Sequence, residues 1–449
     1  MAAIAGIVSS NAKQDVVQML EKMAHRGNNQ ALVKSFKNAT LGISWPMGQP
    51  SAESALSAGT AEDWVSESHY AKAQIKNGSL VLSRDPLGVS PLYYGYTQNN
   101  VLAFASEVKG LLGLVDEVQE LPPGSSLEAG NLRSTFTLSQ QEPVESGRLD
   151  VAANLRRKLE KSVADRAQRG VPYGAWLSGG LDSSVLAAMA RPYIDTMHTF
   201  AAGFEGAQDL EFARMVARHI GSTHHEMTPT FQEIVDVIPE VIYHLESFDA
   251  LLVRSSLMNY LVARLAADYV PAVFSGEGGD ELFAGYSYLH NVPLEDLPGE
   301  LIDIIGRLHN TALQRVDRCS AAHGTLAYVG FLDSQVVDYA LKIPAEYKIF
   351  DGMEKWILRR AAADLLPQPV TLRKKAKFWE GAGVEERLSA FASEKISDDD
   401  FRRERILSHG QELNTKEELY YYRIFKEHFG DFDQLDWMGR TKGSPKDIA

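Results

Sequence analysis

Two glycine-rich stretches of the sequence combine acids and hydroxyls in an order that could bind a phosphate group. The first, SGGLDSS at residues 178–184, follows the apolar run YGAWL and precedes an alanine-rich run typical of a helix. Paired glycines let the backbone turn sharply and expose N–H groups at the positive end of a helix, and serines add hydroxyl donors. The stretch therefore predicts an anion cradle suited to phosphate.

Asp182 lies inside this predicted cradle, where its charge would repel a phosphate unless a cation stood between them. Mg²⁺, which prefers carboxylate and phosphate oxygens, would resolve that conflict. The stretch is not a Walker loop, because the Lys-Ser/Thr ending is missing. Taken alone, it is equally typical of a tight strand–helix turn in which Asp182 caps the helix.

The second stretch, VFSGEGGDELFAGY at residues 273–286, repeats the order of apolar strand, glycine-rich turn and acids. Open parallel sheets bind ligands at the carboxyl ends of their strands, where we expect both turns to lie. Asp280 would then be a second Mg²⁺ ligand facing Asp182, and Glu277 would contact the reacting centre. Two such turns in one domain point to an active site more strongly than either turn does alone.

The elements that must position these turns alternate between helix and strand. Helices are predicted at 149–168, 183–194 and 209–221, and strands at 173–178, 197–204 and 270–278. This alternation predicts a doubly wound parallel sheet in an α/β domain.

The beginning of the chain has a different pattern. Residues 3–10, 80–96 and 101–108 read as strands with Pro/Gly turns, and the polar segment 138–147 reads as a linker. Because 449 residues exceed one ordinary hydrophobic core, we predict two domains, at 1–140 and 149–435.

The composition disfavours several classes of protein. Acidic residues outnumber basic ones, 59 to 45, and this balance disfavours broad nucleic-acid binding. The only cysteine, Cys319, rules out an intrachain disulfide and reads as a small buried residue, and adjacent His224 and His225 should point apart rather than share a metal. With no basic signal segment and no apolar run of about 18 residues, we expect a soluble cytoplasmic protein with no membrane or nucleic-acid partner.

The two glycine-rich stretches resemble known motifs. SGGLDSS looks like the pyrophosphate-binding loop of the ATP pyrophosphatase superfamily, and SGEGGDELFAGY resembles the signature of asparagine synthetases within it. The likeness covers nearly all of residues 150–430 in the family's order. It runs through segments 241–256, 314–323, 331–344, 354–367, 373–383 and 415–429.

This resemblance implies ATP-dependent amide formation: a carboxylate attacks the α-phosphorus of ATP, and a nitrogen nucleophile then displaces AMP from the acyl-adenylate. The resemblance implies that ATP and Mg²⁺ are the cofactors. It also implies that the substrates are a small-molecule carboxylate and either an amine or ammonia, and it is compatible with a homodimer. Glu277 matches a carboxylate that in this family acts on the incoming amine. Lys375 matches a lysine that stabilises the transition states of adenylation and of amide formation. By position it assigns Leu177, Ala202, Ser275 and Gly276 to the adenosine moiety, Ser178, Gly179, Gly180, Asp182, Ser183 and Ser184 to the pyrophosphate, and Asp182 and Asp280 to Mg²⁺.

The N-terminal part resembles the family's glutaminase domain, which implies a shortened Ntn-hydrolase-like α/β/β/α sandwich. The family's glutaminase needs an N-terminal cysteine, but Ala2 and Ala3 stand in that region. The family's substrate loop is unrecognisable in SHYAKAQIKNG, its arginine-bearing stretch reads LGISWPMGQ, and the domain is shortened between about residues 45 and 75. We therefore expect no glutamine hydrolysis, although an engineered replacement of a cysteine would also leave Ala2.

Two alternatives remain open. β-Lactam and carbapenam synthetases share the fold and lack the cysteine, but they carry tyrosine at the position of Glu277 and a glutamate near that of Cys319. A nucleotide-binding pseudoenzyme is the second alternative, because the first domain has decayed. Leu326, Tyr328 and Gly330 also depart from the Glu, Arg and Pro common in asparagine synthetases, so the acyl substrate need not be aspartate.

Overall fold

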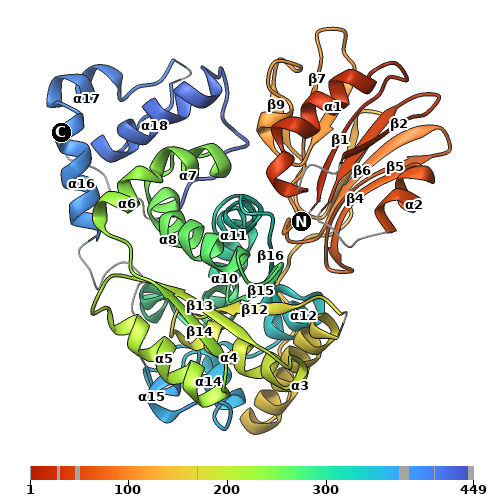
Figure 1. Cartoon of the computed structure of the whole chain (residues 1–449). Helices are drawn as coiled ribbons and strands as arrows, with labels where there is room; N and C mark the ends of the chain where they lie inside the picture. The colour runs from red at the N-terminus through yellow and green to blue at the C-terminus, as the bar shows by residue number, and fades with distance from the viewer. Residues whose placement is uncertain are drawn as a thin grey trace.

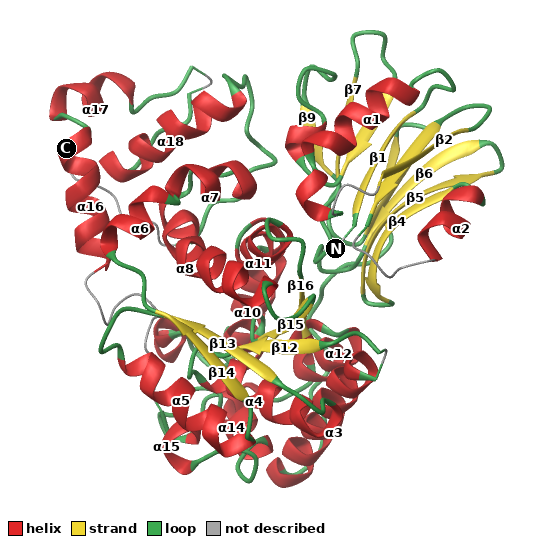
Figure 2. Ribbon diagram, in the orientation of Figure 1, coloured by secondary structure: helices red, strands yellow, loops and turns green. Residues whose placement is uncertain are grey.

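Two domains lie side by side in the computed structural model, an N-terminal domain of strands and a larger C-terminal domain built on a parallel sheet (Figure 1). The structure describes residues 2–27, 31–45, 51–168, 170–373, 384–408 and 410–442. Figure 2 shows how the strands separate into two antiparallel sheets and one parallel sheet flanked by helices. The predicted α/β fold class is confirmed.

The N-terminal domain is a sandwich of two antiparallel sheets. One has the strand order β2-β3-β1-β8-β7-β9 and the other β11-β10-β6-β5-β4. The strands are β1 (Ala3–Ile7), β2 (Ala31–Ser35), β3 (Thr40–Ser44), β4 (Thr60–Ser66), β5 (His69–Lys76), β6 (Ser79–Arg84), β7 (Tyr93–Tyr96), β8 (Leu102–Ala105), β9 (Val118–Glu120), β10 (Ser125–Glu128) and β11 (Asn131–Ser134).

Alternating side chains explain why these sheets stack. Along β5, buried alanines alternate with partly exposed polar residues, and the buried set meets the apolar face of the other sheet. Helix α1 (Lys13–Lys22) covers the outer face of the six-stranded sheet, where a Cβ on Gly42 would come within 2.7 Å of Val16. Helix α2 (Ser51–Ser57) contacts β4, β3 and β2, so it packs where the edges of the two sheets meet.

The C-terminal domain contains a parallel sheet of order β14-β13-β12-β15-β16. Its strands are β12 (Tyr173–Trp176), β13 (His198–Ala202), β14 (Thr223–Met227), β15 (Ala272–Ser275) and β16 (Leu326–Val329). Helices α8 (Ala250–Ala267) and α11 (Ala312–Ala321) cover one face, and α3 (Arg148–Ala167), α4 (Leu181–Ala190) and α5 (Gln208–Ile220) cover the other (Figure 1). The predicted helices and strands match these elements, whereas β14 and β16 were not predicted from the pattern.

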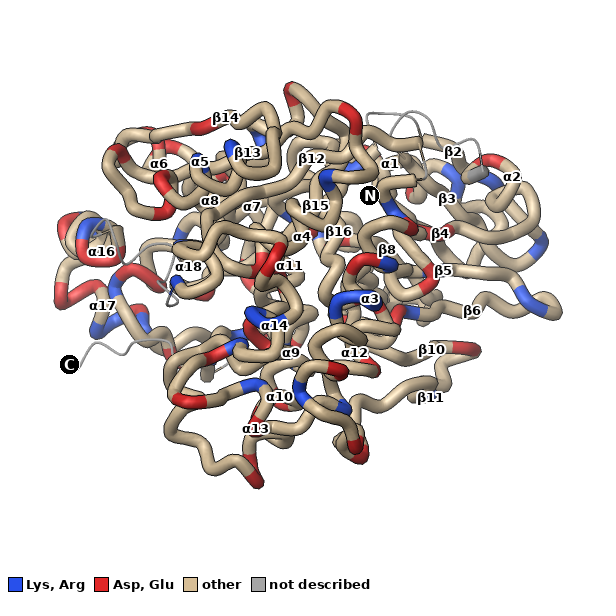
Figure 3. The backbone as a smooth tube through the Cα atoms, turned by 90° about the horizontal axis from the view of Figure 1, so that it is seen from below, with Lys and Arg blue, Asp and Glu red and all other residues tan. Residues whose placement is uncertain are grey.

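The remaining helices complete the C-terminal domain. They are α6 (Phe231–Asp236), α7 (Ile238–Leu245), α9 (Gly279–Phe283), α10 (Leu297–Gly306), α12 (Ser334–Leu341), α13 (Ala345–Lys348), α14 (Trp356–Ala361), α15 (Gln368–Thr371), α16 (Val384–Lys395), α17 (Asp398–Glu404) and α18 (Lys416–Phe429). Within the described part of the chain, no helix is both long and apolar enough to cross a membrane. Basic and acidic positions are interspersed over both domains (Figure 3).

Candidate active site

The two glycine-rich turns meet at the carboxyl ends of neighbouring strands. Strand β12 leads into the first turn and β15 into the second, and the two strands pair directly. A Cβ on Gly276 would lie 2.6 Å from the backbone nitrogen of Ser183, and one on Gly279 would lie 2.6 Å from the carboxyl carbon of Asp182. Only glycine permits this approach, so the glycines bring the two turns together as the sequence predicted.

The first turn holds its hydroxyl groups close to the start of α4. Gly179 has a φ of +73°, and a Cβ there would lie 2.4 Å from the carbonyl oxygen of Asp209. The Ser178 and Ser183 hydroxyl oxygens lie 3.0 Å apart, and the Ser184 hydroxyl donates to the Gly180 carbonyl at 2.6 Å. The turn thus gathers hydroxyls around the N-terminal end of a helix, where the helix dipole favours an anion.

Asp182 does not cap α4. Gly180 is the N-cap residue, and Asp182 lies within the first turn of the helix. The Asp182 carboxylate instead forms an ion pair with Lys355, whose ammonium also lies 2.5 Å from the Asp280 carboxylate. The capping interpretation of Asp182 is therefore wrong, because the carboxylate is used in a contact with a distant part of the chain.

Lys355 is the cation that the two aspartates share. It precedes α14 with a φ of +54°, and only 4% of the residue is exposed. Burial alone would lower the pKa of Lys355, but the neighbouring carboxylates outweigh burial and raise this pKa above its ordinary value. Two carboxylates that converge on one positive charge also have the chemistry of a divalent-cation site.

Glu277 lies on the same turn as Asp280 and contacts a different cation. Its carboxylate accepts a hydrogen bond from the Arg315 guanidinium of α11 at 2.6 Å. Burial would lower the pKa of Arg315, but the attraction of Glu277 raises it. The turn from β15 therefore presents one acid toward Lys355 and another toward Arg315.

The residues predicted to seat adenosine lie at the ends of three adjacent strands. Ala202 ends β13, Leu177 follows β12 and Ser275 ends β15, and the Leu177 N–H donates to the Phe200 carbonyl at 2.7 Å. Lys375 lies outside the described residues. Arg373, two positions before it, donates to the Gly179 carbonyl at 3.0 Å.

Lys355, Arg315 and Arg373 were not identified from the sequence. Lys355 and Arg315 fall within segments 354–367 and 314–323, which resemble the family without indicating individual roles. A single basic residue on an amphipathic segment is most often solvated, and nothing in the local pattern shows which acid it contacts.

One departure from asparagine synthetases is explained by packing. Tyr328 on β16 is 2% exposed, its hydroxyl oxygen lies 3.2 Å from that of Ser162, and its ring faces the Arg166 guanidinium. The Gly330 carbonyl accepts a hydrogen bond from the same Ser162 hydroxyl. This tyrosine therefore fills the core between β16 and α3, rather than joining the ion pairs around Asp182 and Glu277.

Ala2, which directly precedes β1, is buried and hydrogen-bonded. Ala2 is 5% exposed, its N–H donates to Asp63 at 2.8 Å, and its carbonyl accepts from Arg26 at 3.1 Å. Arg26 is fully buried and also bonds Asp317 through two nitrogens, at 2.8 and 2.9 Å. Since Asp317 belongs to α11, this network fastens the first strand to the C-terminal domain.

The cysteine and the adjacent histidine pair adopt the structural roles that the sequence indicated. The Cys319 thiol is buried, and burial raises its pKa to about 12, so the thiol is a poor nucleophile. The neighbouring histidines point apart: His224 contacts Glu226 at 3.1 Å, whereas His225 lies 2.9 Å from His198.

Comparison with known proteins shows the family of this chain. The chain matches the asparagine synthase family over residues 154–302 and 295–442, and the glutamine amidotransferase domain over residues 70–136. It is 35% identical to asparagine synthetase B [glutamine-hydrolyzing] of Escherichia coli, covering 80% of this chain and 69% of the relative. It is also 35% identical to asparagine synthetase [glutamine-hydrolyzing] of Sandersonia aurantiaca, covering 82% and 74% respectively.

A solved NMN synthetase from Francisella tularensis aligns with 65% of this chain and 99% of its own, at 12% identity and a TM-score of 0.29. That likeness is too weak to support a statement about this chain. The extent of the family match, together with the sequence relatives, is decisive. This chain belongs to the asparagine synthase family and is an ATP-dependent ligase of that family.

Proposed function

We propose that this ligase adenylates a small amino-acid-like carboxylate such as aspartate, releases pyrophosphate, and transfers the acyl group to ammonia or an amine without hydrolysing glutamine. The observation that carries the proposal is the convergence of Asp182 and Asp280 on one buried cation beside two glycine-rich turns. Adenylation requires a polyphosphate and its counter-ion to bind at the same place. This site can bind both, because its backbone N–H groups favour anions and its carboxylates favour cations.

In this proposal each part of the site has its own role. Leu177, Ala202, Ser275 and Gly276 seat the adenosine, and the turn at 178–184 holds the pyrophosphate. Arg315 holds the Glu277 carboxylate in position until an amine arrives, and Glu277 then accepts the proton that the amine loses. Lys375 supplies positive charge to both transition states, as the family resemblance implies.

Mg²⁺ fits the residues present. The Asp182 and Asp280 carboxylates would hold it, and the charge it supplies when bound neutralises the phosphates as the leaving group departs. Lys355 neutralises the same two carboxylates within the protein itself. We therefore propose that the ammonium of Lys355 keeps the two acids together and moves toward the phosphate oxygens when nucleotide binds.

We propose residues 1–140 as a degenerate amidotransferase-like domain and 149–435 as the synthetase domain. The contacts of Ala2 support the loss of glutamine hydrolysis, because its N–H is bonded to Asp63 and no side chain there can act as nucleophile. The carbonyl of the same residue is held by Arg26, which is tied to α11. The first strand thus has a structural role in joining the domains.

The test is a panel of carboxylates incubated with ATP and Mg²⁺, with and without ammonia, scored for AMP and pyrophosphate. Asp182→Ala and Asp280→Ala should each abolish pyrophosphate release, whereas Asp338→Ala, which removes an exposed acid paired with Lys342, should leave it unchanged. ADP and phosphate as products would refute adenylation. Mass spectrometry of the amide separates intermolecular transfer from ring closure, because ring closure removes water from a single substrate.

A further inference from the structure

A small pocket lies between the linker and the C-terminal domain, and none of its residues belongs to the candidate active site. It has a volume of about 40 Å³, enough for a molecule of a few heavy atoms. Gln140 and Gln141 of the linker form one side. The apolar wall includes Pro298, Leu301, Ile302, Leu341, Ile343 and Pro344.

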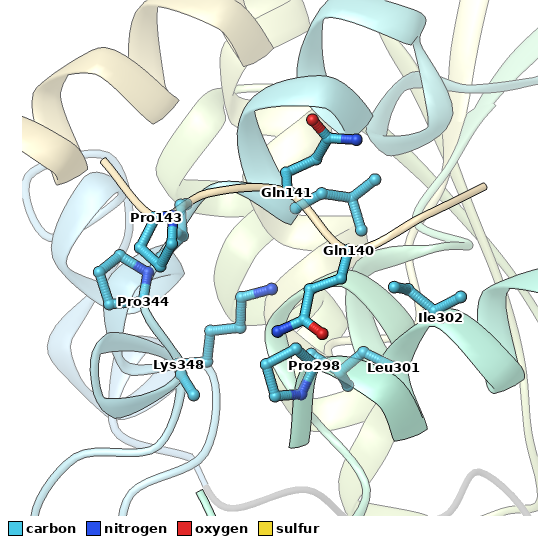
Figure 4. A pocket seen from close by; sticks show the side chains of 11 residues that line it. Gln140, Gln141, Pro143, Pro298, Leu301, Ile302, Pro344 and Lys348 are labelled. Atoms are coloured by element: carbon cyan, nitrogen blue, oxygen red, sulfur yellow. The ribbon is translucent and has the colours of Figure 1, made fainter. Parts of the chain in front are cut away.

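Lys348, the last residue of α13, is the one cationic group that lines this pocket. It is 3% exposed, and within the described residues no hydrogen bond, ion pair or ring contact reaches its ammonium group. Figure 4 shows its amino end and the side-chain amide of Gln140 directed toward the same space. Burial lowers the pKa of Lys348 to about 7.

On α13 itself the acidic residue Glu346 is exposed, and the acids of α10 and α12 that lie nearest the pocket are paired with other cations. Asp338 of α12 pairs with Lys342 at 2.9 Å. On α10, Glu300 contacts Lys442 at 2.7 Å and Asp303 contacts Arg307 at 2.9 Å. A buried cation without a counter-ion is costly, so a ligand that brings a negative charge gains most of its affinity from that one contact.

We propose that this pocket binds a small aliphatic monocarboxylate, whose oxygens contact the Lys348 ammonium and the Gln140 amide while its hydrocarbon part lies on the apolar wall. A single cation favours a single negative charge, since a second charge would remain uncompensated among prolines and leucines. The amide of Gln140 can donate to the second carboxylate oxygen. The proposal does not depend on the catalytic function proposed above.

The experiment follows the Lys348 amine in the full-length protein after reductive methylation with ¹³C-formaldehyde. Its NMR signal is assigned by its absence in Lys348→Met, and Lys342, an exposed and paired neighbour, is the matched control. The pH titration is run with sodium acetate or propionate, and with sodium chloride or sulfate at the same ionic strength. Either carboxylate should raise the pKa of Lys348 by about 1 to 3, as a new opposite charge does at close range, and leave Lys342 unchanged.

Three results would overturn the proposal. The first is a Lys348 signal that titrates like Lys342 without ligand, because the amine would then not be an unpaired buried group. The second is a carboxylate titration identical to that in chloride. The third is an equal response to sulfate, which would show an adventitious anion site without preference for a monocarboxylate. If Lys348→Met folds poorly, Lys348→Arg gives the same assignment, because arginine keeps the charge and its guanidinium is not methylated by formaldehyde.

Discussion

Two buried lysines seven positions apart should respond in opposite directions to the same substitution. Lys348 and Lys355 are 3% and 4% exposed, so each side chain packs within the protein. Lys355 is paired with two aspartates, whereas no partner reaches the Lys348 ammonium among the described residues. Methionine has a similar length and no charge. The two variants therefore compare the effect on stability of removing a buried charge that is paired, at Lys355, with that of removing one that is not, at Lys348.

The magnitudes follow from those environments. Removing one partner of a buried ion pair costs about 3–5 kcal/mol, and we expect about 3 for Lys355→Met, because the paired carboxylates keep 14% and 21% of their surface exposed. Each unit of pKa is worth about 1.4 kcal/mol, so lowering the pKa of Lys348 from 10.5 to about 7 costs at most about 5 kcal/mol. Lys348→Met should recover part of that cost and stabilise the protein.

The pH dependence gives a second test. The pKa of Lys348 is lower in the folded state, so the unfolded chain binds more protons above about pH 7 and the folded protein gains stability as the pH rises toward 10.5. The advantage of Lys348→Met is therefore largest near pH 6 to 7 and declines by about pH 10. The pKa of Lys355 is raised on folding, so its contribution is fully present below 10.5 and is lost only as the pH rises through the higher folded value.

The assay is urea unfolding followed by circular dichroism in EDTA, with a parallel series in excess MgCl₂. Mg²⁺ should restore part of the stability of Lys355→Met, because a cation that binds the folded state shifts the unfolding equilibrium. Lys348→Met should respond to Mg²⁺ as the unsubstituted protein does. Destabilisation by both substitutions, or a gain for Lys348→Met that is the same at all pH values, would refute the reasoning.

Three further substitutions test the catalytic and structural assignments. Glu277→Gln should slow amide formation roughly 10²–10⁴-fold, as expected for a lost general base, while adenylation continues. Analysis of the products should then show AMP and free carboxylate. Undiminished amide formation would remove Glu277 from the mechanism. Ala2→Cys should release no glutamate from glutamine, and glutamate release would mean that the domain is not naturally decayed. Arg26→Met should lower the free energy of unfolding by about 3–5 kcal/mol, since Arg26 is fully buried against three carboxylates. Arg214→Met removes an exposed ion pair and should lower the free energy of unfolding far less. Equal losses of stability in urea would contradict this ranking.

Local patterns in the sequence were sufficient to predict the elements that carry the site. The apolar run before SGGLDSS predicts a buried strand and the alanine-rich run after it predicts a helix, which are β12 and α4. Glycine spacing predicts where the chain can turn sharply, because a positive φ is a property of a single residue, as at Gly179. The approach of Asp182 to the turn that carries Asp280 follows from the rule that parallel strands end at one edge of a sheet.

Only the tertiary structure decides which charges meet. Lys355 lies 173 positions from Asp182 in the chain, and Arg315 reaches the turn that carries Glu277 from helix α11. Tyr328 departs from the residue common in asparagine synthetases, and only the structure shows that it packs against Ser162 and Arg166. Lys348 and Lys355 are the same residue type, seven positions apart, and their sequence contexts do not show which one is paired. An ion pair depends on where two side chains lie in space and on how much water surrounds them, and both are set by the packing of elements far apart in the chain.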